Sequence, residues 1–183
     1  MRLFTTGELT SLEVKAIREL LDVAFAPDED ERFTEDDWQR AIGGMHFVLD
    51  VDSAVAAHAS VVVRVLHVRG APLRTGYVEA VATAPSHQRR GLGTRVMRDV
   101  GKYISERFEL GALGTGRHGF YERLGPLAGP SSSSACRGSG RTILSEDRVE
   151  TQSRRGSVAR MVAWMGFEPM TSSLKGKWSR KAA

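Results

Sequence analysis

The residue types best suited to chemistry lie together in one short segment, Gln88–Gly93, which reads Gln-Arg-Arg-Gly-Leu-Gly. Its two glycines let the backbone approach a ligand closely, because no Cβ stands in the way. Successive N–H groups at the start of a helix converge on an anion, and the helix dipole favours negative charge there. Arg89 and Arg90 add positive charge at the edge of the segment. The segment therefore predicts a binding site for a pyrophosphate group.

Two other phosphate-binding patterns are absent from this segment. It is not a Walker A loop, because Gly-x-x-x-x-Gly-Lys does not occur, and it is not the Gly-x-Gly-x-x-Gly pattern of dinucleotide-binding folds. An Arg- and Gly-rich turn before an amphipathic helix has the same composition. From these residues alone, both interpretations stay open.

The elements that would position this segment follow from capping residues and hydrophobic spacing. Thr10 and Glu13 have the spacing of a capping box, and the apolar helical face that follows ends near Pro27. Thr34 begins a second helix that stops at Gly43-Gly44. Strands are expected over 46–49, 54–68, 73–83 and 110–113. One helix is expected to open at Gln88–Gly93 and to bury apolar residues as far as Ile104, and another to span 119–124. This order of helices and strands predicts an α+β fold with a mixed sheet.

The charge divides the chain into two segments of different composition. Residues 1–125 carry 16 Lys and Arg against 18 Asp and Glu, whereas residues 126–183 carry 10 against 4. A nucleic-acid surface should lie on the folded part of a protein, so no specific nucleic-acid partner is expected. We predict a domain over 1–125 and an atypical basic tail over 126–183, its ending replaced by a shifted reading frame.

Strand patterning is weak in the tail. Residues 126–134 have the composition of a linker, and no hairpin pattern of paired β-branched runs follows them. One apolar run stands out, Arg160–Phe167, which Gly166 interrupts and Pro169 follows. C-terminal strands are therefore left in doubt.

Several classes of protein are disfavoured by composition. No run of 18 apolar residues occurs and the N-terminus has no apolar core of a secretory signal, so we expect a cytoplasmic protein without a membrane partner. The single cysteine, Cys136, excludes an intramolecular disulfide. No set of His, Cys and carboxylates has ligand spacing, so no metal is expected.

A resemblance to a known family adds to these observations. The pattern Gln-x-x-Gly-x-Gly after a strand resembles the acetyl-coenzyme A (acetyl-CoA) loop of the GNAT N-acetyltransferases. The flanking sequence resembles the aminoglycoside 2'-N-acetyltransferases over about residues 8–125. The segments that carry this likeness are Trp38, Gly43–His46, Gly76–Ala82, Leu110–Leu113 and Phe120–Gly125.

The resemblance implies a fold and a co-substrate. The fold is a GNAT-like, mixed and mainly antiparallel sheet with flanking helices, in which one bulged strand separates from its neighbour and holds acetyl-CoA. That strand would be Leu73–Thr83. The residues expected to bind the co-substrate are Val81, Ala82, Thr83, Gln88, Arg89, Arg90, Gly91, Leu92 and Gly93.

Two catalytic residues are implied by the same resemblance. The acceptor arrives as an ammonium and must lose a proton before it attacks the thioester. Glu79, the only Asp or Glu between Asp52 and Asp99, would accept that proton, and Tyr121 would protonate the departing thiolate. Plainer interpretations are a solvent-facing strand residue for Glu79 and a packing residue for Tyr121. His118 is a further candidate acid.

The acceptor side rests on charge as well as on the resemblance. Aminoglycosides are polycations, which carboxylates attract, and residues 28–37 hold seven carboxylates against the single Arg32. Acidic residues in a first helical turn are also favoured by the helix dipole without any substrate. The residues that would contact the acceptor are Asp37, Glu79, Ala80, Gly114 and Thr115.

Three functions remain open on the sequence. The chain could acetylate an aminoglycoside amine, or another small amine or peptide. It could also be a coenzyme A-binding scaffold without turnover, because the missing hairpin would leave a sheet edge uncovered. A homodimer is expected from the resemblance alone.

Overall fold

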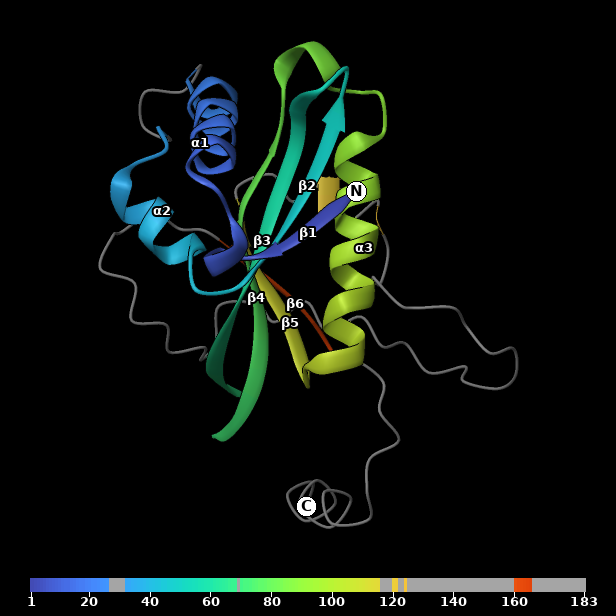
Figure 1. Ribbon diagram of the computed structural model, residues 1–183. Helices are drawn as coiled ribbons and strands as arrows, with labels where there is room; N and C mark the ends of the chain where they lie inside the picture. The colour runs from blue at the N-terminus through green and yellow to red at the C-terminus, as the bar shows by residue number, and fades with distance from the viewer. Residues whose placement is uncertain (27–31, 69, 116–119, 122–123, 125–159, 166–183) are drawn as a thin grey trace, which may run out of the picture.

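In the part of the chain that the structure describes, one sheet of six strands forms the centre, with α1 and α2 on one face and α3 on the other (Figure 1). The structure is a computed structural model that describes residues 1–26, 32–68, 70–115, 120–121, 124 and 160–165. The strands are β1 (Arg2–Thr5), β2 (Met45–Val51), β3 (Ala54–Val68), β4 (Ala71–Thr83), β5 (Leu110–Thr115) and β6 (Arg160–Met165). The helices are α1 (Ser11–Phe25), α2 (Glu35–Ala41) and α3 (Leu92–Arg107), with short 3-10 turns at Thr6–Glu8 and Pro85–His87.

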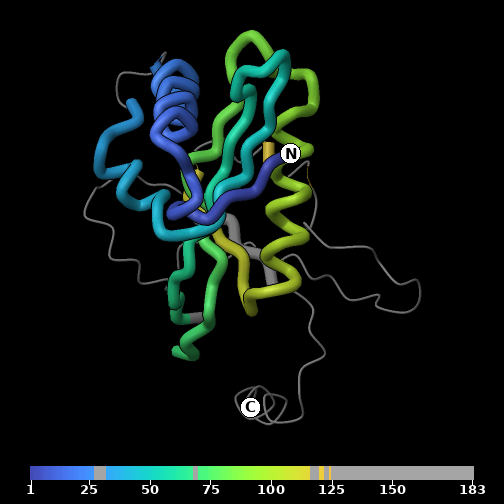
Figure 2. The backbone as a smooth tube through the Cα atoms, in the orientation of Figure 1, coloured from blue at the N-terminus to red at the C-terminus, as the bar shows by residue number. Residues whose placement is uncertain are grey.

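The sheet is mixed and mainly antiparallel, as the sequence predicts. Its strand order follows the chain from β1 to β6, and among the described strands only β4 and β5 pair in parallel, joined through α3. The connected ends of β3 and β4 extend beyond the rest of the sheet (Figure 2). The α+β prediction is therefore confirmed.

The capping residues begin both N-terminal helices where the sequence places them. The Thr10 hydroxyl accepts the N–H of Glu13 at 3.3 Å, and the Glu13 carboxylate reaches back to the Thr10 N–H at 2.9 Å. Thr34 and Asp37 repeat this arrangement in α2. β3 covers the predicted residues, whereas β1 was not expected, because its four residues are too few to show a period.

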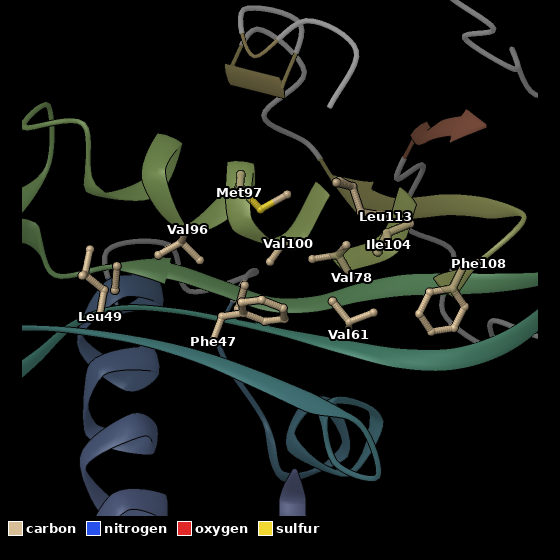
Figure 3. Close-up of a cluster of buried hydrophobic side chains, with 12 residues drawn as sticks. Phe47, Leu49, Val61, Val78, Val96, Met97, Val100, Ile104, Phe108 and Leu113 are labelled. Carbon is tan, nitrogen blue, oxygen red and sulfur yellow. The ribbon is translucent and has the colours of Figure 1, made fainter. Parts of the chain in front are cut away.

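The larger core lies between α3 and the sheet. Figure 3 shows Val96, Met97 and Val100 of α3 in one buried cluster with Phe47 and Val78 of the sheet. A second cluster fills the opposite face under α1 and α2 and includes Ile17, Leu21, Trp38 and Val48. Because both faces of the sheet are covered, the central strands are buried on both sides.

One strand forms in the segment where the sequence shows no hairpin. β6 pairs antiparallel with β5 along Leu110–Thr115, so the expected open edge of β5 is covered in the structure. The sequence leaves the C-terminal strands open, and the structure forms one of them at Arg160–Met165, within the single apolar run of the tail. The physical reason is that a short apolar run has no period of its own to identify it, while an unpaired strand edge supplies it with hydrogen-bond partners.

Other predictions lie partly or wholly outside the described residues. Of the predicted helix over 119–124, the structure describes Phe120, Tyr121 and Leu124, and His118 and Cys136 lie outside it. The hypothesis of a shifted reading frame stays a prediction. Among the helices that the structure describes, none has the length and apolar character needed to cross a membrane.

Candidate active site

The centre of the site is the point where β4 separates from β5. The two strands pair only from Thr75 to Val78 of β4, although β4 continues to Thr83. In the part of the chain that the structure describes, no strand pairs with this edge of β4 beyond Val78. The backbone groups on that edge from Glu79 onward are therefore available to a ligand.

A β-bulge lies at the same place on the other edge of β4. Ser60 of β3 is opposite Glu79, but His58 is opposite Ala82, so β4 has one residue more than β3 between these pairs. Ala80 has a φ of 50°, in the left-handed region that residues other than glycine rarely adopt. The bulge is thus built by a strained alanine directly after Glu79.

The bulge changes which face each residue of β4 occupies. Val78 and Val81, three positions apart, both pack in the core under α3. Ala80 and Ala82 pack in the cluster under α1 and α2. A regular strand would alternate with a period of two, so the bulge is what brings Ala80 to the α1 and α2 face.

Glu79 is a largely buried carboxylate on that face. Its side chain is 22% exposed, and burial raises its pKa to about 6. Arg64 and Arg40 oppose this shift, and the negative charge of Asp37 adds to it. A carboxyl with such a pKa is ionised at neutral pH but remains a better base than an ordinary glutamate.

Arg64 is a functional candidate that the sequence analysis missed. Its guanidinium donates a hydrogen bond to the Glu79 carboxylate and lies 4.2 Å from the ring centroid of Tyr77. Tyr77 is itself affected, because burial and the charge of Glu79 raise the pKa of its hydroxyl. The sequence offers one signal for a role of Arg64, because it is the single charged residue in the apolar run from Val61 to Leu66.

Asp37 lies near Glu79 but is also used by its own helix. One carboxylate oxygen accepts hydrogen bonds from the N–H and hydroxyl of Thr34, at 2.9 and 2.7 Å. The other lies 3.4 Å from the Arg40 guanidinium. The carboxylate therefore caps α2, and its charge also acts on Glu79, whereas its contact with an acceptor stays a prediction.

The predicted pyrophosphate segment, Gln88–Gly93, follows the end of β4 and includes the first two residues of α3. Gly91 is the N-cap of α3 with a φ of 79°, and no side chain caps the helix there. A Cβ on Gly93 would lie 3.1 Å from the Thr83 hydroxyl, so this glycine allows the helix start to approach β4. Gln88, Arg89 and Arg90 are exposed beside it. The backbone arrangement fits a bound anion.

The remaining predicted residues occupy two further places. Gly114 and Thr115 are the last residues of β5, and the Gly114 backbone forms a hydrogen bond with the Tyr77 hydroxyl.

Tyr121 packs against the core under α3, and its ring centroid lies 4.9 Å from that of Phe120. Phe120 in turn would be 3.4 Å from a Cβ on Gly93. Tyr121 therefore belongs to the α3 side of the sheet.

The arrangement suits proton transfer next to an extended ligand. A carboxylate of raised pKa stands where an unpaired strand edge begins, and a helix start suited to an anion lies at the end of that edge. Among the described residues, no group of three or more His, Cys, Asp or Glu side chains could hold a metal ion.

A splayed and bulged strand followed by a glycine-rich helix start agrees with the comparison to known families. The model of the acetyltransferase (GNAT) domain matches residues 6–126. The chain belongs to the GNAT acetyltransferase family. The aminoglycoside 2'-N-acetyltransferase of Mycolicibacterium fortuitum is 38% identical to it over 135 residues, which make up 72% of this chain and 67% of that protein.

Solved structures share the fold of this GNAT domain. An acyl-CoA N-acyltransferase from Pseudomonas aeruginosa has a TM-score of 0.54 at 18% identity, over 68% of this chain and 85% of that one. A GNAT family acetyltransferase from Brucella melitensis, solved in complex with acetyl-CoA, has a TM-score of 0.50 at 19% identity, over 68% of this chain and 80% of that one. A GCN5-related N-acetyltransferase from Kribbella flavida has a TM-score of 0.52 at 19% identity over 68% of this chain, which spans about a third (32%) of its length.

Proposed function

We propose that this GNAT domain transfers the acetyl group of acetyl-CoA to the 2'-amine of an aminoglycoside. The observation that carries the proposal is Glu79, a buried carboxylate of raised pKa at the residue where β4 leaves β5. The substrate class comes from the similarity to the aminoglycoside 2'-N-acetyltransferase of Mycolicibacterium fortuitum.

Two backbone features would hold the co-substrate. Gln88, Arg89, Arg90, Gly91, Leu92 and Gly93 would bind the pyrophosphate through N–H groups and two guanidinium charges. The unpaired edge of β4 at Val81, Ala82 and Thr83 would hydrogen-bond the pantetheine arm. When bound, acetyl-CoA supplies an activated acyl group and a thiolate leaving group.

Glu79 would act as the general base. The acceptor ammonium loses one proton to the Glu79 carboxylate, directly or through a water, and the free amine attacks the thioester carbon. A pKa of about 6 keeps most of the carboxylate ionised at neutral pH, and it raises the affinity of that carboxylate for the proton. Arg64 would hold Glu79 until the acceptor arrives, because an incoming ammonium competes for the same oxygens.

Tyr121 would act as the general acid. As the C–S bond breaks, the electron pair stays on sulfur, and the Tyr121 hydroxyl would donate a proton to it. The nitrogen of the new amide then loses its second proton, which would restore the Tyr121 hydroxyl, while the first proton leaves Glu79 to solvent. The role of this residue comes from the family resemblance. Its place beside Phe120, which approaches the start of α3, is compatible with a donor near the co-substrate.

The acceptor would lie on the α2 side of Glu79. Asp37 supplies negative charge toward a polycation, and Ala80, Gly114 and Thr115 would form the adjoining backbone. Arg40 and Arg64 bring positive charge to the same place, which limits how many ammonium groups can be accommodated near Glu79. Selectivity for one amine of a polyamine would follow from this mixture of charges.

The decisive experiment measures free thiol released from acetyl-CoA by the full chain. One acceptor carries a 2'-amine, and its matched control has a 2'-hydroxyl in the same position. We expect release only with the amine, and a loss of about 100-fold in Glu79→Gln. Glu19→Gln is the matched control, because that carboxylate is 65% exposed on α1. Thiol release with other small amines but not with the aminoglycoside would contradict the proposed acceptor. Equal activity of Glu79→Gln and the unaltered chain would contradict the role of Glu79 as the base.

A further inference from the structure

Two buried histidines that the proposed mechanism does not use lie beneath α2. His46 of β2 and His58 of β3 are both completely buried, on the face that α1 and α2 cover. Their ring centroids are 5.3 Å apart, and the ring of Trp38 lies 6.0 Å from His46. Burying two imidazoles is costly unless their nitrogens are hydrogen-bonded.

All four ring nitrogens have a partner, and the partners form one chain that ends at the bulge. His58 Nδ1 lies 2.8 Å from the carbonyl oxygen of Ala80. His58 Nε2 lies 3.1 Å from His46 Nδ1, and His46 Nε2 lies 2.9 Å from the Thr6 hydroxyl. The chain therefore connects the turn before α1 with the residue after Glu79.

The chemistry of the end group determines the direction of each hydrogen bond. A carbonyl can only accept, so His58 Nδ1 carries a proton and donates it to Ala80. Burial lowers the pKa of His58 to about 3 and that of His46 to about 4, so both rings are neutral at pH 7. His58 Nε2 then accepts from His46 Nδ1–H, and His46 Nε2 accepts from the Thr6 hydroxyl.

The Thr6 hydroxyl completes the chain at its outer end. Its oxygen accepts the backbone N–H groups of Gly43 and Gly44 at 2.8 and 3.2 Å. Its proton is assigned to His46 Nε2 at 2.9 Å, because the other acceptor within reach, the Gly44 carbonyl oxygen, is farther away at 3.4 Å. A single protonation pattern thus satisfies every group from Gly43 to Ala80. A network satisfied in only one way holds its members in one arrangement.

The hydrogen-bond chain ends at the Ala80 carbonyl oxygen, which excludes a role as a proton relay. A carbonyl oxygen cannot pass a proton on, so this chain is no route for the proton that Glu79 takes up. It holds a backbone atom instead. The backbone atom is the carbonyl oxygen of Ala80, the residue with a φ of 50°. The left-handed conformation of Ala80 forms the bulge and so sets the positions of Glu79 and of the residues after Ala80.

We propose that His58, itself held by His46 and Thr6, is a positioning residue that fixes the Ala80 carbonyl and with it the β4 bulge. The bulge sets the place of Glu79 and the course of Val81 to Thr83. The kinetic consequence rests on the proposed function, whereas the hydrogen-bond chain and its hold on the bulge do not. Ser60 assists from the same strand, since its hydroxyl donates to the Glu79 carbonyl at 3.3 Å.

The first test uses the unaltered protein and needs no substrate. Nitrogen-15 NMR of the two imidazoles at pH 7 should show both rings neutral, with the proton on Nδ1 and a bare Nε2. The Nδ1–H form is the one that the chain demands at both positions. A proton on Nε2 of either ring, or a charged ring at pH 7, would overturn the proposal.

The second test compares two substitutions at one position. His58→Asn keeps an N–H near the place of Nδ1, whereas His58→Leu keeps the volume and removes the donor. The carbonyl carbon-13 shift of Ala80 and the amide shifts of residues 79–81 should change in His58→Leu and stay near the original values in His58→Asn. The same shifts in all three proteins would contradict the proposal.

Binding and turnover provide the functional readout. Losing one hydrogen bond to a buried carbonyl corresponds to about tenfold in an equilibrium constant. We expect His58→Leu to bind acetyl-CoA about tenfold more weakly by calorimetry and to lose about tenfold in kcat, with His58→Asn within about threefold of the original in both. Unchanged affinity and kcat in a folded His58→Leu would overturn the positioning role. Absence of acetyl-CoA binding in the unaltered protein would instead count against the proposed function alone, since the NMR tests do not depend on it.

Discussion

The pH dependence of acetyl transfer gives a sharp prediction about Glu79. With a pKa of about 6, the carboxylate is about 90% ionised at pH 7 and about 9% ionised at pH 5. If the ionised form is the base, kcat/KM for the acceptor should fall about tenfold between these two values. A glutamate of ordinary pKa would lose less than about a fifth of its activity over the same range.

The fall in kcat/KM toward low pH forms the acidic limb of the pH–rate profile. The charge of Arg64 influences the pH at which this limb lies. Burial is the largest influence on the pKa of Glu79, and the Arg64 charge opposes it. Arg64→Met keeps an apolar stem against Tyr77 but removes the charge. The pKa of Glu79 should then rise further, so the limb should move to higher pH and activity at pH 6 should decrease.

The assay is free-thiol release at saturating acetyl-CoA from pH 5 to pH 8, with samples adjusted to one pH before the thiol is measured. In Glu79→Gln the limb near pH 6 should disappear along with most of the activity. Three results would refute the reasoning: a limb retained in Glu79→Gln, a limb below pH 5 in the unaltered chain, or a shift to lower pH in Arg64→Met.

Three further predictions concern co-substrate binding and stability. Gly93→Val should weaken acetyl-CoA binding at least about tenfold by calorimetry, because its Cβ would press on the end of β4, and unchanged affinity would exclude this close approach. Thr34→Ala should lower the free energy of unfolding by about 1 kcal/mol in urea, because it removes the capping box with Asp37, and an unchanged midpoint would count against that role. Burial lowers the pKa of His46 to about 4 and that of His58 to about 3, from the ordinary value of 6.5. Between pH 6.5 and pH 4 the unfolded chain therefore takes up protons that the folded chain does not, and the free energy of unfolding decreases as the pH falls. His58→Asn should reduce this slope by about 1.4 kcal/mol per pH unit, and an equal slope in both proteins would mean that His58 is not buried and neutral.

Local signals explain why much of the fold could be predicted from the sequence. Thr10 and Thr34 begin their helices because capping depends on residues three apart, which the sequence displays directly. The long apolar run of β3 and the face of α3 are also local patterns. Glu79 could be singled out because it is an isolated carboxylate in an apolar strand.

The features that were missed depend on contacts between distant residues. Arg64 is brought to Glu79 by the register of β3 on β4, and His46 meets His58 through the register of β2 on β3. No spacing along the chain reports either register. β6 forms because β5 offers an unpaired edge, which is a property of the assembled sheet.

The proposed reaction transfers an acetyl group to one particular nitrogen of the acceptor, that of the 2'-amine. The most direct measurement supplies acetyl-CoA labelled with carbon-13 in the acetyl group, together with an aminoglycoside that carries several amines, and locates the label in the product by NMR. We expect one acetyl group, attached to the 2'-nitrogen. Label on another nitrogen, on several nitrogens equally, or only in free acetate would contradict it.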